Sequence, residues 1–140
     1  MSKGYEYLEH TADVYIKAVG KSLKEAFENA GKATTAVMTD IEKVEPIKSI
    51  TVEIEAENLE ELLYQWLEEI IFRFDAEGLL ISKFEVREIA EDGSILKGII
   101  KGEEFDPEKH TQQLGVKAVT YHMMEINRNE KVILKFVLDV

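Results

Sequence analysis

Hydrophobic residues recur at helical spacing between residues 58 and 75. With a period of about 3.6 residues they fall on one stripe, made of Leu59, Leu62, Leu63, Trp66, Leu67, Ile70, Ile71 and Phe74. Asn58 can accept a hydrogen bond from the first-turn amides while Glu61 reaches back, as in a capping box, and Gly78 follows the end. The pattern predicts a helix that packs this stripe against the core.

A second helix is predicted to begin at Ser22. Ser22 and Glu25 form a second Ser-x-x-Glu cap, and apolar residues then follow helical spacing at Leu23, Ala26, Phe27, Ala30, Ala33 and Val37. The helical pattern weakens between Met38 and Asp40, where we expect the helix to end.

Elsewhere the hydrophobic period drops to two, which is typical of strands with one solvent-facing side. Ile50, Val52 and Ile54 alternate with polar residues. Similar patterns predict five further strands, over residues 14–19, 79–89, 94–101, 116–126 and 132–140.

Turn residues and element order together predict the fold class. Asp92-Gly93 separates two strands and is a strong signal for a two-residue hairpin turn, and residues 127–130 join the last two strands. The predicted order is strand, helix, strand, helix and then four strands. Four consecutive strands favour an antiparallel or mixed sheet with the two amphipathic helices packed on one side. We therefore expect residues 1–140 to form a single α+β domain.

Composition narrows the class of protein. The 140 residues are 45% hydrophobic, which suffices for one buried core. No apolar run reaches about 18 residues and residues 1–7 lack the order of a signal peptide, so we expect a cytoplasmic protein with no membrane association. Cysteine is absent, which excludes disulfides, thiolate metal sites and a cysteine nucleophile.

The formal net charge is −11, from 28 acidic and 17 basic residues. An acidic chain repels the phosphate backbone of nucleic acids, so we do not expect direct, tight nucleic-acid binding. A basic protein or a cation is the better candidate partner. The alternative is that the excess carboxylates serve solubility alone.

The segment His10-Thr11-Ala12-Asp13 leads into the first predicted strand. Alternation along this strand places Ala12, Val14, Ile16 and Ala18 inward. Asp13 is then expected on the opposite face. The alternatives are that Asp13 caps a turn through its own backbone and that His10 is a hydrogen-bonded structural histidine.

The last two predicted strands form a hairpin whose turn sets their register. With Ile126 opposite Lys131, Ala118 faces Asp139. The same register pairs His122 with Lys135 and Lys117 with Val140. It also predicts one shared apolar face, made of Val119, Tyr121, Met123, Leu134, Phe136 and Leu138.

If the strand at 14–19 lies alongside the last strand, Asp13, Asp139 and the terminal carboxylate of Val140 form an all-oxygen cluster. Such a cluster repels itself unless it is protonated, paired with a cation such as Lys117, or bound to a metal ion. Ca²⁺, Mg²⁺ and Mn²⁺ match oxygen ligands, whereas Zn²⁺ favours His or Cys. The alternative is that Asp139 is a solvated edge residue at a frayed terminus.

The sequence contains no other pattern typical of a catalytic site. It lacks a Gly-rich phosphate loop, a His-Glu-x-x-His motif and a Gly-x-Ser-x-Gly motif. Residues 106–110 are typical of a short helical turn, and we assign no role to His110. A small metal-dependent hydrolase that uses the same carboxylates stays an alternative, with His10 and His122 as its candidate bases.

Three segments resemble the signature blocks of the archease family. They are Tyr7-Leu8-Glu9-His10-Thr11-Ala12-Asp13, Lys117-Ala118-Val119-Thr120-Tyr121-His122 and the C-terminal Leu138-Asp139-Val140. The chain length also fits the family from end to end. Residues around Met123 and Met124 are less typical of it.

The resemblance implies a non-enzymatic accessory protein of the GTP-dependent, RtcB-type tRNA-splicing RNA ligase. Archeases promote attachment of GMP to the ligase's active-site histidine, support multiple turnover and broaden nucleotide use. An older suggestion is a chaperone-like modulator of nucleic-acid-processing proteins. A holdase or homo-oligomeric scaffold is the corresponding alternative.

The resemblance also implies site residues. The family's metal-binding positions correspond to Asp13, Asp139 and Val140, the last through its terminal carboxylate, with Ca²⁺ as the expected ion and Mg²⁺ or Mn²⁺ as alternatives. Lys117 matches a family lysine that could pair with phosphate or with the carboxylates. His10 and His122 are further candidates for functional roles.

Overall fold

The computed structural model describes residues 4–8 and 13–140. Within these residues the elements follow the predicted order, with one short strand added at the start. They are β1 (Tyr5–Leu8), β2 (Val14–Gly20), α1 (Leu23–Met38), the 3-10 helix η1 (Ile41–Lys43), β3 (Lys48–Glu55), α2 (Leu59–Glu77), β4 (Leu79–Ile89), β5 (Ile95–Glu104), β6 (Ala118–Asn127) and β7 (Val132–Asp139).

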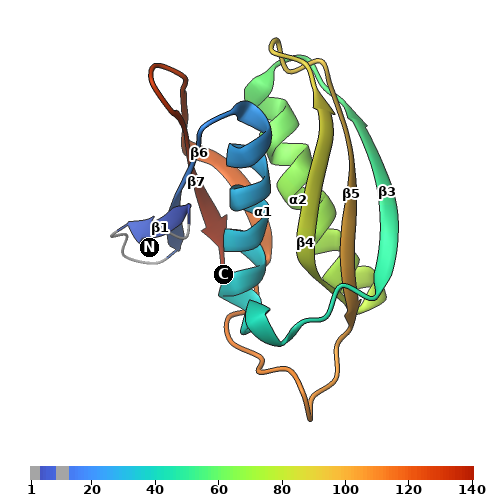
Figure 1. The fold of residues 1–140 in the computed structure, drawn as a ribbon. Helices are drawn as coiled ribbons and strands as arrows, with labels where there is room; N and C mark the ends of the chain where they lie inside the picture. Colours follow the sequence, from blue (N-terminus) through green and yellow to red (C-terminus); the bar gives the residue numbers. More distant parts are fainter. Residues whose placement is uncertain (1–3, 9–12) are drawn as a thin grey trace.

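The two helices lie between two antiparallel sheets (Figure 1). One sheet has the strand order β1-β2-β7-β6 and the other β3-β5-β4. Helix α1 packs on β4 and β2, and α2 packs on β6 and β4. The α+β class, with antiparallel strands and both helices packed on them, is confirmed, and the strands divide into two sheets where the sequence pattern predicted a single one. The long connection between β5 and β6 carries the chain across the helical layer, and local strand patterns hold no information about that crossing.

Helix α2 begins and ends with the predicted caps. The side chain of Asn58 accepts from the N–H of Glu61 at 2.8 Å. The carboxylate of Glu61 accepts from the N–H of Glu57 at 2.8 Å, one residue before the position that a standard capping box uses. Gly78 adopts a left-handed conformation with φ 65° and ends the helix, as expected of a C-terminal glycine.

Helix α1 also matches its prediction. Ser22 caps it by accepting from the N–H of Glu25, and the helix ends at Met38. The buried indole of Trp66 in α2 donates to the carbonyl of Phe27 in α1 at 2.8 Å, which joins the two helices in the core. In the part of the chain that the structure describes, no helix combines the length and the apolar character needed to cross a membrane.

The hairpin between β4 and β5 forms at the predicted place but with a longer turn. Ala90 donates to the carbonyl of Ile95 at 3.0 Å, so residues 91–94 form the loop in place of a two-residue turn. Gly93 supplies the positive φ of 82° that the loop needs. The Asp92-Gly93 motif therefore predicted the position of the hairpin correctly, but the predicted loop was two residues too short.

β2 lies beside β7, the last strand of the chain. β2 pairs with β7 along its whole length, from Val14 opposite Leu138 to Gly20 opposite Val132. This confirms the predicted neighbourhood of the two segments. β1, which the hydrophobic pattern did not predict, adds a short edge strand to β2.

Candidate functional site

Most of the residues that the sequence singled out meet at one end of the β2 and β7 pair. At this end the last pair is Val14 opposite Leu138. The same antiparallel register places the next residues, Asp13 and Asp139, opposite each other. On the other side of β7, Ala118 pairs with Asp139 as predicted. The N–H of Lys117 donates to the carbonyl of Asp139 at 2.7 Å. The sheet thus gathers these residues next to the C-terminal Val140.

The carboxylates at this end are open to solvent. Asp139 is exposed and alternates with the buried Leu138, so its side chain is on the outer face of the sheet. Asp13 and Val140 are half-buried. The exposed ammonium of Lys117 forms no ion pair with another described residue, and its observed link to Asp139 is through the backbone. His10 lies outside the described residues.

The donor chemistry at this end suits a hard divalent cation, because every candidate ligand atom is a carboxylate oxygen. Over residues 4–8 and 13–140, no three His, Asp or Glu side chains are close enough to share a metal ion. An ion held by Asp13 and Asp139 therefore needs a ligand of another kind. Val140 follows Asp139 directly in the sequence.

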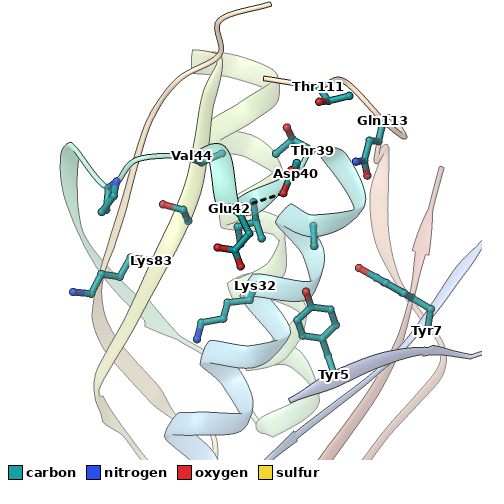
Figure 2. Close-up of a pocket in the computed structure, with 14 residues that line it drawn as sticks. Tyr5, Tyr7, Lys32, Thr39, Asp40, Glu42, Val44, Lys83, Thr111 and Gln113 are labelled. Atoms are coloured by element: carbon teal, nitrogen blue, oxygen red, sulfur yellow. Dashed lines mark hydrogen bonds between the residues drawn. The ribbon is translucent and has the colours of Figure 1, made fainter. Parts of the chain in front are cut away.

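A groove of about 810 Å³ opens at the C-terminal end of α1 (Figure 2). Its walls come from β1, α1, η1, β4 and the connection between β5 and β6, and include Tyr5, Lys32, Asp40, Glu42, Lys83 and Thr111. A smaller hollow beside it is lined by Asp13 and shares Tyr7, Ala36 and Gln113 with the groove. The carboxylate end and the groove are thus adjoining parts of one surface.

The hydroxyl groups of the groove are hydrogen-bonding groups and not bases. The hydroxyl of Thr39, a residue that is 1% exposed, has no hydrogen-bond partner among the described residues, and neither has that of Ser82. Burial raises the pKa of Tyr5, with a further contribution from Glu42, and burial together with Tyr5 raises the pKa of Tyr7 to about 12. Both tyrosines are therefore protonated near neutral pH.

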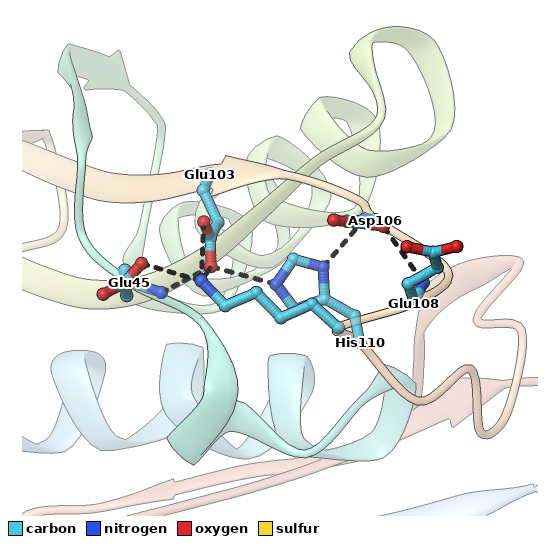
Figure 3. Close-up of polar contacts among 6 residues, drawn as sticks. Glu45, Glu103, Asp106, Glu108 and His110 are labelled. Carbon is cyan, nitrogen blue, oxygen red and sulfur yellow. Dashed lines mark hydrogen bonds and ion pairs between the residues drawn. The ribbon is translucent and has the colours of Figure 1, made fainter.

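The connection that leads to Lys117 is anchored by a buried histidine (Figure 3). Nδ1 of His110 accepts from the N–H of Asp106 at 2.9 Å, and Nε2 is 2.9 Å from a carboxylate oxygen of Glu103. Because Nδ1 is the acceptor, Nε2 carries the proton and donates to Glu103. This role could not be predicted from the sequence, because His110 stands in a short polar turn without hydrophobic periodicity.

Glu103 is the centre of this network. It accepts from the N–H of Glu45 at 2.8 Å and pairs with the ammonium of Lys109 at 2.8 Å. Burial acts to raise the pKa of Glu103, but the hydrogen bonds from Glu45, Lys109 and His110 outweigh it and lower the pKa to about 2. The network ties residues 105–110 to β5 and to the segment before β3. It is an anchor for the loop, and both ring nitrogens of His110 are occupied by it.

The predicted register of β6 holds only at the carboxylate end. Thr120 pairs with Val137 as predicted, but Glu125 takes the place expected for His122 opposite Lys135. Residues 121–124 form a bulge that shifts the rest of the strand. Extra residues in a bulge change neither composition nor alternation enough to be seen in the sequence.

Because of the bulge, the predicted apolar face is wrong at two positions of β6. Tyr121 and Met123 are exposed, in place of packing with the core. Met123 has a left-handed φ of 61°. His122 is exposed too, and its N–H donates to the hydroxyl of Thr120 at 3.0 Å. The structure therefore does not place His122 opposite Lys135, as the sequence predicted.

Comparisons with known sequences agree with the resemblance. The sequence model of the archease protein family (MTH1598/TM1083) matches residues 5–140. Protein archease of Sulfurisphaera tokodaii is 48% identical over 137 residues, which cover 97% of this chain and 98% of that protein. Protein archease of Danio rerio is 40% identical over 141 residues, covering 100% of this chain and 87% of that protein.

Two solved structures share the fold. The solution structure of Methanobacterium thermoautotrophicum protein 1598 matches with a TM-score of 0.84 and 41% identity, covering 99% of this chain and 100% of that one. A crystal structure from Thermotoga maritima, described as an archease and possible chaperone, matches with a TM-score of 0.63. It is 21% identical and covers 95% of this chain and 94% of that one, so it shows a likeness of fold alone.

Proposed function

Because this chain belongs to the archease family, we propose that it is a non-enzymatic activator of the GTP-dependent, RtcB-type tRNA-splicing RNA ligase. In this role it promotes guanylylation of the ligase, supports multiple turnover and broadens nucleotide use. It acts in the cytoplasm as a protein partner of the ligase and not by binding RNA tightly itself. The net charge of −11 supports this last point, since it repels phosphate.

The observation that carries the proposal is the placement of Asp13 beside Asp139 at the end of the β2 and β7 pair. Asp139 is exposed, and Asp13 and Val140 are half-buried, at this edge of the sheet. We propose that Asp13, Asp139 and the Val140 carboxylate hold a divalent cation, with Ca²⁺ as the expected ion. When bound, the ion would supply positive charge next to the ligase's nucleotide.

The chain's own residues hold this edge in place and present it. β2 and β7 position the two aspartates, and the backbone bond from Lys117 to Asp139 adds β6 as a third support. The His110 network anchors the loop before Lys117. The ammonium of Lys117 is exposed and is the candidate group for contact with a phosphate of the ligase-bound nucleotide.

Three groups near the edge are not available as the general base of the hydrolase alternative. Tyr5 and Tyr7 are protonated donors, and His110 is committed to the fold. A hydrolase needs a general base within hydrogen-bond reach of its water. Incubating the purified chain alone with a panel of nucleotides and finding turnover would reinstate the hydrolase.

The proposal is tested with purified ligase that has stalled after a single turnover. Addition of this protein is expected to restore transfer of labelled GMP to the ligase. Asp13→Ala and Asp139→Ala should each reduce the rate of transfer by about tenfold or more, because each removes one charged ligand. Asp75→Ala removes an exposed aspartate at the end of α2 and serves as the matched control. Full stimulation by both site variants would refute the proposed role of this edge.

A chaperone-like role is the second candidate. The observation in its favour is a set of large apolar side chains left at the surface, namely Tyr7, Ile47, Phe72, Leu114, Tyr121 and Met123. A holdase should suppress aggregation of unrelated proteins and form large assemblies in light scattering. Neither behaviour is expected of a dedicated ligase activator.

A further inference from the structure

The bulge in β6 places a tyrosine on the surface of α2. The rings of Tyr64 and Tyr121 stack with their centroids 4.4 Å apart and their planes 10° from parallel. Tyr121 is nevertheless 51% exposed. Since Tyr64 covers one face of the Tyr121 ring, the solvent-facing surface of that ring is its other face. The pair therefore presents an open aromatic face at the junction of α2 and β6.

The backbone of the bulge is in an unfavourable conformation. Residues 121–124 stand opposite a single residue of β7, Phe136, because Thr120 pairs with Val137 and Glu125 with Lys135. Within the bulge, Met123 has a φ of 61°, which the Cβ of a non-glycine residue disfavours. Such conformations concentrate where a particular side-chain arrangement is needed for function. Here the arrangement is the outward display of Tyr121.

Two carboxylates lie on the same face of α2 as Tyr64, since Glu61 precedes it by three residues and Glu68 follows it by four. Burial raises the pKa of Tyr121, and the nearby charges of Glu61 and Glu68 raise it further. No cation among the described residues pairs with Glu68, which is exposed. The adjacent Glu69 differs, because Arg73 neutralises it at 2.6 Å. The carboxylate of Glu68, which has no paired cation among the described residues, thus lies near the exposed face of the Tyr121 ring.

We propose that Tyr121, together with Glu61 and Glu68, forms a docking site for an arginine or lysine side chain of a basic segment in a partner protein. A guanidinium or ammonium group is attracted to the face of an aromatic ring within about 6 Å of its centroid. Carboxylates at the rim add charge-assisted hydrogen bonds, for which arginine is the best match. The net charge of −11 steers a basic partner to the surface.

Other occupants fit less well. The bases of single-stranded RNA also stack on tyrosine, but their phosphates would be repelled by Glu61 and Glu68. A second copy of this acidic chain would bring like charges together. The proposal concerns a surface on α2 and β6, and it does not depend on the ligase being the partner.

The test is an NMR titration of the ¹⁵N-labelled full chain with the blocked peptide acetyl-Gly-Arg-Arg-Gly-amide. Chemical shift changes are expected to concentrate in residues 61–72 and 120–124. Tyr121→Ala should weaken the affinity by about tenfold, and Glu68→Gln by about threefold. Asp75→Asn removes the same charge from the same helix and should leave the affinity unchanged. The amide spectrum of each variant establishes that it is folded.

The proposal is overturned if Asp75→Asn and Glu68→Gln weaken binding equally, or if the shift changes spread over the whole acidic surface. Tighter binding of an oligouridylate than of the peptide would assign the ring to RNA. Sedimentation of the free protein as a dimer that Tyr121→Ala dissociates would assign it to a second copy. Asp13→Ala should bind the peptide like the parent chain, so that failure of the ligase proposal leaves this result unaffected.

Discussion

Trp66 donates its indole N–H to the carbonyl of Phe27 at 2.8 Å, and both side chains are fully buried. The bond crosses from α2 to α1 in the middle layer of the molecule, where each helix also packs on strands of both sheets. The ring of Trp66 further contacts Phe84 of β4 in an edge-to-face arrangement. A change at Trp66 therefore acts on the layer that holds the two sheets together.

Trp66→Phe is expected to destabilise the protein by about 2 to 4 kcal/mol, because it leaves a cavity and removes the partner of the Phe27 carbonyl. The free energy of unfolding is measured by urea denaturation. Phe72→Ala is the control on the same helix: its ring is exposed, so the change should stay within about 0.5 kcal/mol. Equal effects of the two substitutions would contradict the packing described for α2.

Glu103 should make the stability depend on pH in the acid range. Its pKa is about 2 in the folded protein, against an ordinary value of 4.5. A lowered carboxyl pKa contributes stability that is complete above pH 4.5 and is lost as the pH falls towards 2. The parent chain should thus lose up to about 3 kcal/mol from this group across that range.

Glu103→Gln isolates the contribution of the Glu103 charge to the free energy of unfolding. The variant should be less stable than the parent at pH 7, and the difference should shrink as the pH falls below 4.5, because the glutamine has no charge to lose. Urea denaturation of both proteins at several pH values between 3 and 7 measures the difference. A gap that is constant with pH would show that Glu103 contributes by packing and not by charge.

His110→Ala should loosen the loop that leads to the carboxylate edge. The substitution removes the acceptor for the N–H of Asp106 and the donor to Glu103, both within the buried network. We expect faster amide hydrogen exchange at residue 106 and at Lys117, whose N–H donates to Asp139. His122→Ala, an exposed histidine of the β6 bulge, should leave both amides unchanged.

The sequence predicted those parts of the fold that depend on local pattern. The caps at Ser22 and Asn58 and the pairing of Ala118 with Asp139 were all found. The predicted adjacency of Asp13 and Asp139 followed from placing the strand at residues 14–19 beside the last strand. That strand pairing is confirmed, whereas binding of a metal ion at these residues stays a prediction.

The features that the sequence did not predict depend on long-range packing. The division into two sheets follows from the path of the loop between β5 and β6, which the His110 and Glu103 contacts hold in place. The bulge at Tyr121 depends on the stacking partner Tyr64 in another element. In both cases the deciding contact joins residues far apart in the chain, so no local window contains it.

Met123 and Gly78 share the left-handed backbone conformation, so its energetic cost can be tested by adding a side chain at Gly78 and by removing one at Met123. Met123 has a φ of 61° and Gly78 a φ of 65°, and a Cβ at Gly78 would meet no atom of the described residues within 4 Å. Gly78→Ala should therefore destabilise the protein by about 1 kcal/mol through backbone strain alone. Met123→Gly should relieve the corresponding strain and stabilise by up to about 1 kcal/mol, since its side chain is 43% exposed and little packing is lost.

Met123→Val gives the third measurement, because a β-branched residue tolerates the left-handed conformation least and should destabilise by about 1 kcal/mol or more. Urea denaturation of the three variants ranks them against the parent chain. A destabilising Met123→Gly would mean that the packing of the methionine side chain stabilises the bulge by more than the backbone strain destabilises it.

Peptide binding by Met123→Gly tests whether the strained backbone serves to display Tyr121. If it does, the added conformational freedom at residue 123 should raise the stability of the protein and weaken its affinity for the peptide.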